Sequence, residues 1–253
     1  MRELRQLKSK KGRTETGLFL VEGEKFIAEI PNSWEIQRYI LAKQYADGLN
    51  LSDYKKRAPV EIVRDSLFNS LADTVNPQGI IAVCRQKHTQ LEKLLTPGGF
   101  MLMGERLNDP GNIGTLIRTA AAAGATGIIL TEGSADIYNP KVLRAAAGAV
   151  LRIPIATDVS LNKAVSQLKN AGYAIYATHP RGDALPYTLD LKKSFCWLVG
   201  NESHGLTENA INLADAKVRL PMADDIESLN ASIAGGVLLY EAVRQRMTCA
   251  FDK

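Results

Sequence analysis

Three polar junctions, each following an apolar run, constrain the fold of this chain most strongly. They span residues 108–114, 200–205 and 220–232. The third runs from an apolar strand end through an acidic loop into a helical pattern that opens with Ser228, Asn230 and Ser232. One small polar side chain is enough to cap the start of a helix. The two further polar side chains therefore indicate that this loop holds a polar ligand.

Strands and helices alternate regularly after residue 99. Apolar runs at 100–103, 127–130, 174–177, 195–199 and 218–222 are separated by helical patterns at 114–123, 140–147 and 160–170. This alternation predicts an α/β domain with a mainly parallel sheet and helices on both faces. Ligands of such sheets bind at the carboxyl ends of the strands, where loops lead into helices. The three junctions are therefore expected to meet at one site.

The last helix is expected over residues 229–245. Leu229, Ile233, Val237, Tyr240 and Val243 form one stripe along it. Gly235 and Gly236 lie in its interior, where each glycine costs about 1 kcal/mol relative to alanine. This cost predicts close packing of the helix against another backbone or a ligand.

The first part of the chain has shorter elements. Strands are expected at 18–21, 36–41, 60–63 and 79–84, with helices at 24–29 and 65–73. A segment that ends in Thr-Pro-Gly-Gly follows and is typical of a connector. We therefore divide the chain into an N-terminal domain (1–90), a linker (91–99) and a C-terminal domain (100–253).

Composition excludes several classes of protein. No apolar run approaches the roughly 18 residues of a membrane span, and no apolar segment of signal-peptide type follows the basic N-terminus. A cytoplasmic protein is expected. The three cysteines (Cys84, Cys196 and Cys249) and the three histidines are scattered, so neither a disulfide framework nor a metal site is predicted.

Positive charge is concentrated at the N-terminus. The whole chain carries a net charge of +4, yet its first 13 residues hold six basic side chains against one acidic side chain. We name this segment the basic arm; its candidate phosphate-binding residues are Arg5, Lys8, Lys10, Lys11 and Arg13. The arm is either a phosphate-binding element or a solvated terminus.

The helical pattern after the first junction places an arginine among apolar residues. Asn112 or Thr115 is positioned to cap this helix, and Arg118 lies about one turn further on. An arginine beside an apolar face needs an anion or water. Two interpretations stay open, an anion-binding residue and an arginine that snorkels to the surface.

The second junction resembles a phosphate-binding loop but lacks its lysine. Gly200 to Thr207 reads GxxxxG-Leu-Thr, with Leu206 in place of the lysine that reaches the phosphates of a nucleotide. A nucleoside triphosphatase is therefore disfavoured. Glu202 in this loop suits a cationic or hydroxyl-bearing ligand better than a phosphate. A GxGxxG dinucleotide fingerprint is also missing.

In order and spacing, the three junctions resemble the motifs of the SpoU (TrmH-type) RNA 2′-O-ribose methyltransferases. The segments that carry the resemblance are 108–118, 198–206 and 220–232, with Asn139 to Arg144 ahead of Gly148 as a further match. In the N-terminal domain, residues 19–25 and 76–82 resemble the ribosomal-protein-like RNA-binding domain that many members carry.

This resemblance implies S-adenosylmethionine as methyl donor, a ribose 2′-hydroxyl of RNA as acceptor, an obligate homodimer and a C-terminal trefoil knot. Expected donor-binding residues are Thr178, Gly200, Leu220, Met222 and Leu229. The catalytic residues it implies are Arg118, Asn112, Glu202, Ser228 and Asn230. The basic arm and Arg144 are expected to bind RNA. Neither a membrane nor a metal is implied.

Several functional alternatives stay open. Ribosomal RNA is favoured as the substrate because of the N-terminal domain, with transfer RNA as the alternative. A non-catalytic RNA-binding protein with the same fold is a second possibility, although every polar motif residue is present. A methyltransferase that modifies a base is a third, but Asn112, Arg118 and the Ser-Leu-Asn triplet at 228–230 favour ribose.

Overall fold

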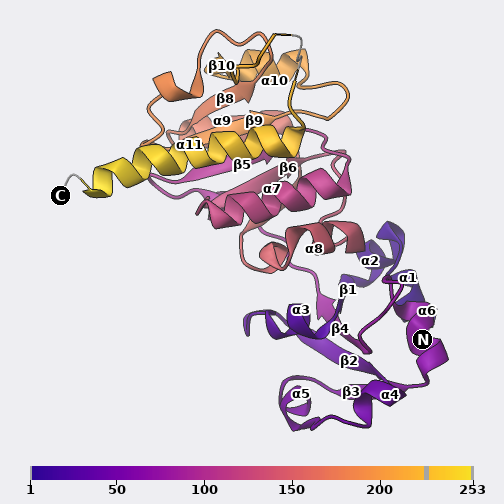
Figure 1. Ribbon diagram of the computed structural model, residues 1–253. Coiled ribbons are helices and arrows are strands. Elements are labelled where there is room, and N and C mark those ends of the chain that lie inside the picture. The colour runs from indigo at the N-terminus through magenta and orange to yellow at the C-terminus, as the bar shows by residue number, and fades with distance from the viewer. Residues whose placement is uncertain (1, 225–227, 252–253) are drawn as a thin grey trace. The chain divides into compact units, whose positions relative to one another are not determined.

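Two separately packed units make up the computed structural model, which describes residues 2–224 and 228–251 apart from the side chains of Arg2 and residues 248–251 (Figure 1). Unit 1 comprises the chain up to Lys87 together with Asp136–Leu151, and unit 2 comprises His88–Ala135 and the chain from Arg152 onward. No helix of the described residues is long and apolar enough to cross a membrane.

A four-stranded sheet forms the centre of unit 1. Its strands are β1 (Leu18–Glu22), β2 (Ile36–Ala42), β3 (Val60–Val63) and β4 (Ile80–Arg85), in the order β1-β4-β2-β3. β4 is antiparallel to β1 and β2, and β3 runs parallel to β2. The helices of this unit are α1 (Arg2–Gln6), α2 (Lys10–Thr16), α3 (Glu24–Ala28), α4 (Lys43–Ala46), α5 (Ser52–Arg57), α6 (Asp65–Leu71) and α8 (Pro140–Ala146). All four strands expected from the sequence are present.

The basic arm is folded into α1 and α2, which contradicts the alternative of a solvated terminus. Leu4 and Leu7 are buried in a core cluster with Phe68 of α6, so α1 is held by apolar burial. Charge dominates the composition of this segment and conceals that its two leucines are spaced for one face of a helix.

Residues 136–151 pack on unit 1, although the sequence division assigned them to the C-terminal domain. The ring of Tyr138 lies 4.5 Å from that of Phe19, and its hydroxyl donates to the carbonyl of Lys87 over 2.7 Å. Trp34 Nε1 donates to the carbonyl of Leu151 over 2.9 Å. These contacts anchor both ends of the segment.

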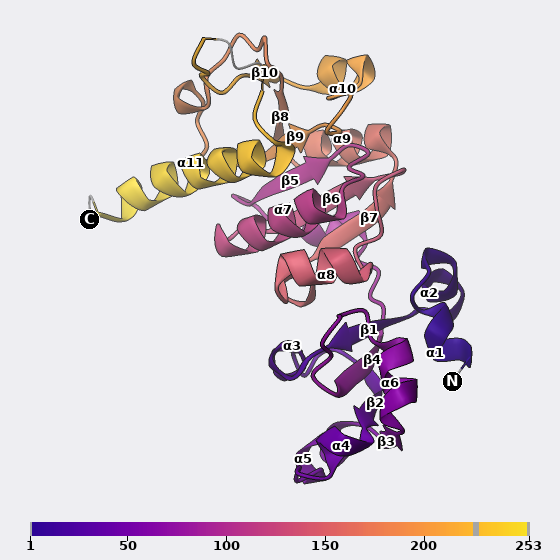
Figure 2. The same ribbon diagram turned by 45° about the vertical axis from the view of Figure 1, so that its right-hand side comes forward.

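Unit 2 is built on a six-stranded sheet in which every pair of neighbouring strands is parallel (Figure 2). Its order is β10-β8-β9-β5-β6-β7, where the strands are β5 (Phe100–Gly104), β6 (Gly127–Thr131), β7 (Ile155–Val159), β8 (Ala174–Thr178), β9 (Phe195–Val199) and β10 (Ala216–Val218). The parallel sheet expected from the sequence is confirmed. β7 was not expected, and β10 overlaps the predicted strand at 218–222 only at Val218.

Helices cover both faces of this sheet, as expected. α7 (Pro110–Ala122) packs beside α11 (Ala231–Phe251), and a Cβ atom on Gly235 would lie 2.5 Å from Leu116 Cδ2 and 3.2 Å from Leu102 Cδ1. The glycine is therefore required for close packing, in this case against side chains. α9 (Leu161–Asn170) and α10 (Glu208–Leu213) share a core with Met101 and Met103 on the opposite face.

The expected linker at 91–99 is part of unit 2. Leu91 and Leu94 of the short 3₁₀ helix η1 (Leu91–Leu94) are buried in that same core. A free connector would expose such leucines to water. The trefoil knot stays a prediction, because residues 225–227, between β10 and α11, lie outside the described residues.

Candidate active site

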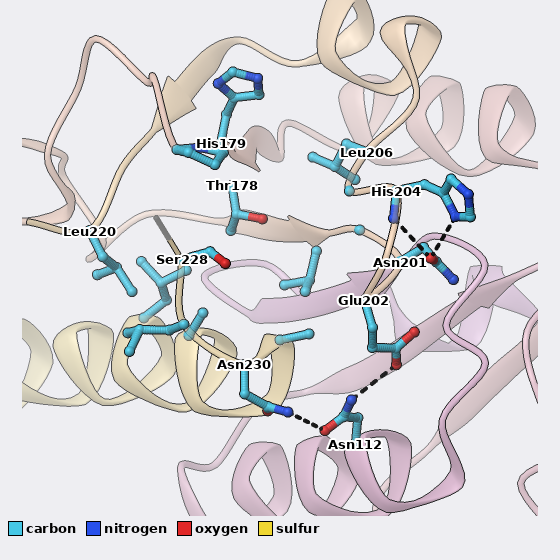
Figure 3. Close-up of a pocket in the computed structure, with 18 of the residues that line it drawn as sticks. Asn112, Thr178, His179, Asn201, Glu202, His204, Leu206, Leu220, Ser228 and Asn230 are labelled. Atoms are coloured by element: carbon cyan, nitrogen blue, oxygen red, sulfur yellow. Dashed lines mark hydrogen bonds between the residues drawn. The ribbon is translucent and has the colours of Figure 1, made fainter. Parts of the chain in front are cut away.

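A cavity of about 580 Å³ lies in unit 2 at the carboxyl ends of β8, β9 and β10. It is lined by the loops that follow these strands, by the first turn of α7 and by the start of α11 (Figure 3). This is the edge where ligands of parallel sheets bind. Its volume falls in the range of about 300–1,000 Å³ that is typical of small-molecule sites.

Hydrogen bonds join one side chain from each of the three polar junctions. Asn230 Nδ2 donates to Asn112 Oδ1 over 2.9 Å, and Asn112 Nδ2 donates to Glu202 Oε1 over 3.2 Å (Figure 3). Glu202 also accepts from the backbone N–H groups of Asn108 and Asp109, at 3.4 and 3.3 Å. The expectation that the junctions meet at one site is therefore confirmed.

The helix caps differ from those expected. α7 is capped by Asp109, which accepts from the N–H of Asn112 over 2.7 Å, and not by Asn112 or Thr115. At the start of α11, Asn230 Oδ1 accepts from the N–H groups of Ser232 and Ile233, at 2.9 and 3.3 Å. Because these caps are made by other residues, the side chain of Asn112 is available to the cavity.

The loop after β9 is a tight turn closed by its own backbone. Asn201 and Gly205 exchange N–H···O bonds of 3.0 and 2.9 Å. A Cβ atom on Gly200 would lie 2.3 Å from the backbone of Gly205, so only glycine fits there. The Asn201 side chain accepts from the N–H groups of Ser203 and His204 and donates to the carbonyl of Arg106. This loop is therefore rigid and fixes the position of Glu202.

Glu105 supports the far end of this loop and was missed at the sequence level. Its carboxylate is buried, and it accepts from Thr207 Oγ1 over 2.7 Å and from Thr207 N–H over 2.9 Å. Buried carboxylates need such partners. The carboxylate directly after an apolar strand was the one available signal for this role.

All five predicted donor-binding residues line the cavity. The carboxylate of Glu202 is present among the described lining residues, and neither a lysine nor an arginine is. Leu220, Met222 and Leu229 provide an apolar wall, while Ser228 and Asn230 offer polar groups. This donor set fits a ligand with a flat apolar ring and a positive charge, as S-adenosylmethionine has, and does not fit a nucleoside triphosphate.

The predicted arginines lie outside the cavity. Arg118 is exposed on α7, and in the described part of the chain its guanidinium has no hydrogen-bond or ion-pair partner. The Arg144 guanidinium, in unit 1, is paired with Asp73. Asn112 and Arg118 are six positions apart, which places them on different faces of α7. Within this chain, Asn112 lines the cavity and Arg118 does not.

The basic arm residues differ in their accessibility. The prediction for Arg13 is corrected, because its side chain is only 3% exposed, its Nε donates to Asp136 Oδ2 over 2.7 Å and its Nη1 donates to the carbonyl of Leu7 over 2.8 Å. Lys8 donates to the carbonyl of Ala72 over 2.7 Å, and Arg5 donates to Ser70. Lys10 and Lys11 are exposed.

Two histidines of the cavity wall were not singled out from the sequence. His179 follows β8 and His204 lies in the loop after β9 (Figure 3). Their positions directly after strands were the signal. No group of three or more His, Cys, Asp or Glu side chains in the described chain could hold a metal ion.

Comparison with known proteins supports this interpretation. Residues 99–240 match the model of the SpoU rRNA Methylase family, and residues 1–82 match that of the MRM3-like substrate binding domain. The chain is 34% identical over 241 residues to the 23S rRNA (guanosine(2553)-2′-O)-methyltransferase RlmP of Bacillus subtilis (strain 168), covering 95% of this chain and 94% of that protein.

Solved structures agree along nearly the whole length. An AdoMet-bound rRNA methyltransferase from Sinorhizobium meliloti is 33% identical and has a TM-score of 0.87, covering 96% of this chain and 93% of that one. The SpoU methyltransferase AviRb from Streptomyces viridochromogenes, in complex with AdoMet, is 29% identical with a TM-score of 0.88, covering 98% and 97%. With its motifs joined at one cavity and its full length matched, the chain belongs to the SpoU rRNA methylase family.

Proposed function

We propose that this protein transfers a methyl group from S-adenosylmethionine to a ribose 2′-hydroxyl of 23S ribosomal RNA, and that it acts as a homodimer. The observation that carries the proposal is the hydrogen-bonded set Asn230, Asn112 and Glu202 beside a cavity that suits the donor. The RlmP relative, whose name states this reaction on 23S rRNA, supports it.

The donor would be held by the loops after β8, β9 and β10. Leu220, Met222 and Leu229 suit its adenine ring, and the backbone near Thr178 and Gly200 can satisfy polar edges of the ring. When bound, S-adenosylmethionine supplies a methyl group that its sulfonium already activates. The protein therefore has to position the acceptor oxygen and accommodate the loss of its proton.

Asn112 and Asn230 are the side chains suited to orient the ribose. Glu202 receives N–H bonds from Asn108, Asp109 and Asn112, so its oxygens are occupied by donors. Its role is to fix the amide of Asn112 rather than to take a proton from the substrate. Ser228, which lines the cavity, offers a further hydroxyl to the substrate or donor.

The homodimer is supported by an apolar stripe along α11 and the residue Leu229 just before it, which we define as Leu229, Ile233, Val237, Tyr240 and Met247. These side chains are exposed by 40% at Leu229 and by 53% at Ile233 and Met247. A stripe of this kind along one helix is typical of an interaction surface. It contains four of the five residues that the sequence placed on one face.

A second copy would also explain the position of Arg118. Because Arg118 is exposed and does not line the cavity of its own chain, we assign it to the cavity of the partner subunit. There it would hold an RNA phosphate and stabilise charge that develops on the 2′-oxygen. A guanidinium stays protonated in proteins and is therefore a poor general base. A planar two-pronged donor fits this role, so Arg118→Lys should be strongly impaired.

Ribosomal RNA is favoured over transfer RNA because unit 1 resembles a substrate-binding domain along residues 1–82. Lys10 and Lys11 are exposed residues of the basic arm that are suited to contact it, and Lys11 also forms a surface ion pair of 3.8 Å with Glu15. The cytoplasmic location expected from the sequence accords with this substrate.

Methyl transfer from labelled S-adenosylmethionine into separate preparations of unmodified 23S rRNA and transfer RNA tests the reaction. We expect label in 23S rRNA, resistant to alkaline hydrolysis at one linkage, and its loss in Asn112→Ala. Label in transfer RNA alone would overturn the choice of substrate. Donor binding without transfer to either RNA would favour a non-catalytic RNA-binding protein.

Mixed dimers test the placement of Arg118. Consider a heterodimer in which one subunit carries Arg118→Ala and the other carries Asn230→Ala. If each site is shared between the subunits, one of its two sites combines an intact pocket with an intact arginine. Random pairing of equal amounts makes about half of the dimers heterodimers, and each heterodimer has one active site of two. The mixture should therefore recover about a quarter of wild-type activity. No recovery would mean that Arg118 acts within its own chain.

A further inference from the structure

Arg106 has a backbone conformation that its own residue type does not explain. Its φ is 51°, in the left-handed region. The other two described non-glycine residues with positive φ have ordinary reasons: Ala147 ends α8, and Asp158 has a short polar side chain of the kind that tolerates this region. Glycine would adopt the conformation of Arg106 without strain. The arginine side chain therefore needs a separate explanation.

The backbone of Arg106 is fixed from two sides. Its N–H donates to Oγ1 of the buried Thr131 over 3.0 Å. Its carbonyl accepts from Asn201 Nδ2 over 2.9 Å. Since Asn201 lines the cavity, Arg106 is one hydrogen bond away from the cavity wall. A costly conformation held by its surroundings at such a place is typical of functional residues.

The side chain of Arg106 is exposed and unpaired. Its Cγ lies 3.5 Å from where a Cβ atom of Gly133 would be, so the stem extends over the loop that follows β6. No described residue forms a hydrogen bond or ion pair with the guanidinium. The positive group is thus held at the carboxyl edge of the sheet, beside β5 and β6, and is free to bind an anion.

We infer that Arg106 is a substrate-positioning residue that binds a backbone phosphate of the RNA next to the target nucleotide. This inference rests on the proposed function. A strand whose ribose enters the cavity must carry its neighbouring phosphates across the same edge of the sheet. The described cavity lining of this chain has neither lysine nor arginine to meet them, so apart from Arg118 of the partner subunit a cation for these phosphates has to come from beside the cavity. An arginine can bind a phosphate in two-pronged fashion.

Arg106→Gly is the decisive variant, because it removes the charge and also relieves the backbone. With a 23S rRNA transcript, we expect KM for RNA to rise about tenfold while kcat and the affinity for S-adenosylmethionine stay unchanged. The slope of log binding constant against log salt should fall by about one. The melting temperature should stay level or rise, which a purely structural role for the arginine would not allow.

Three variants serve as controls. Arg106→Lys keeps the charge and should show a smaller rise in KM. Arg106→Asn removes the charge with a residue that tolerates positive φ, and it serves if the glycine variant folds poorly. Lys163→Ala removes an exposed charge from α9, which packs on the face of the sheet opposite to α7 and α11. This variant should behave like wild type.

Filter binding of the same transcript without donor separates this inference from the proposed function. Weaker binding by Arg106→Gly supports it even if wild type transfers no methyl group. Unchanged binding and KM would show that Arg106 is merely solvated, and an effect on kcat or donor affinity alone would equally overturn the inference. Absence of RNA binding by wild type would overturn both.

Discussion

Asn230 and Asn112, which are 118 positions apart, are joined by one hydrogen bond of 2.9 Å that links the start of α11 to the first turn of α7. Asn230 uses both ends of its amide, since its oxygen caps α11 and its nitrogen donates to Asn112. These two roles can be separated by substitution.

Asn230→Asp keeps the capping oxygen and loses the donor to Asn112. We expect stability close to wild type with a loss of methyl transfer of about a hundredfold or more, as for other lost positioning groups. Asn230→Ala loses both roles and should also lower the free energy of unfolding by about 1 kcal/mol. Urea denaturation and single-turnover kinetics measure the two effects. Equal destabilisation by both variants would contradict the assignment of the cap.

Glu105 supports the loop that carries Glu202, so its removal should loosen that loop. Glu105→Ala leaves the partly buried N–H of Thr207 without its carboxylate partner and should destabilise the protein by about 1–2 kcal/mol. Weaker donor binding should accompany this loss. Glu105→Gln retains one acceptor and should lie between the alanine variant and wild type in chemical denaturation and calorimetric titration. A wild-type donor affinity in Glu105→Ala would exclude the supporting role.

Gly235 and Gly236 form a matched pair on α11. A Cβ atom on Gly235 meets the buried Leu116 and Leu102, whereas on Gly236 its nearest neighbour is Thr119 Cγ2 at 3.5 Å. Gly235→Ala should destabilise by about 1–3 kcal/mol through overpacking. Gly236→Ala should be neutral or stabilising by up to about 1 kcal/mol, because alanine favours the helix. Thermal denaturation of both variants is the measurement, and the reverse order would disprove the packing.

The apolar stripe of α11 can be tested by a single charge. Val237→Arg should convert the homodimer to a monomer and abolish methyl transfer, since a buried unpaired charge is costly at an interface. Val75→Arg makes the same change at a valine that is 96% exposed in unit 1 and should leave the dimer intact. Size-exclusion chromatography with light scattering decides. A dimeric Val237→Arg protein would place the interface elsewhere.

The contribution of Glu241 to the stability of α11 is expected to depend on pH. A hydrogen bond from Arg244, aided by one from Gln245, holds the pKa of the Glu241 carboxyl below its ordinary value of 4.5. A lowered folded-state pKa contributes stability above the unfolded pKa that is lost as pH falls through the folded value. Glu241→Gln should therefore be less stable than wild type near neutral pH, with a difference that shrinks below pH 4.5. A difference that stays constant under acid would contradict this.

The sequence predicted the catalytic edge of unit 2 because parallel strands deliver their following loops to one place. That rule brought Asn112, Glu202 and Asn230 together correctly. The same rule could not predict whether Arg118 serves the site of its own chain or that of a second copy. Helical periodicity shows which residues share a face of α7, but it gives no information about a neighbouring chain. The strand β7 was missed because its Thr157 and Asp158 interrupt the apolar pattern.

Three other features were hidden for related reasons. The helices α1 and α2 were concealed by their charge. The 3₁₀ helix η1 was obscured by the neighbouring Pro-Gly-Gly, which is typical of loops. Residues 136–151 continue an α/β pattern locally, so nothing in their periodicity reveals that their apolar side chains are buried against unit 1.

That last segment has a consequence for how the chain can be divided. The polypeptide passes between the units after Lys87, after Ala135 and after Leu151, so a single cut cannot release either unit whole. Deleting the residues up to Lys87 would strip Tyr138 and Leu151 of their partners Phe19 and Trp34. A shortened protein built from unit 2 alone would therefore need a new connection between β6 and β7 in place of residues 136–151.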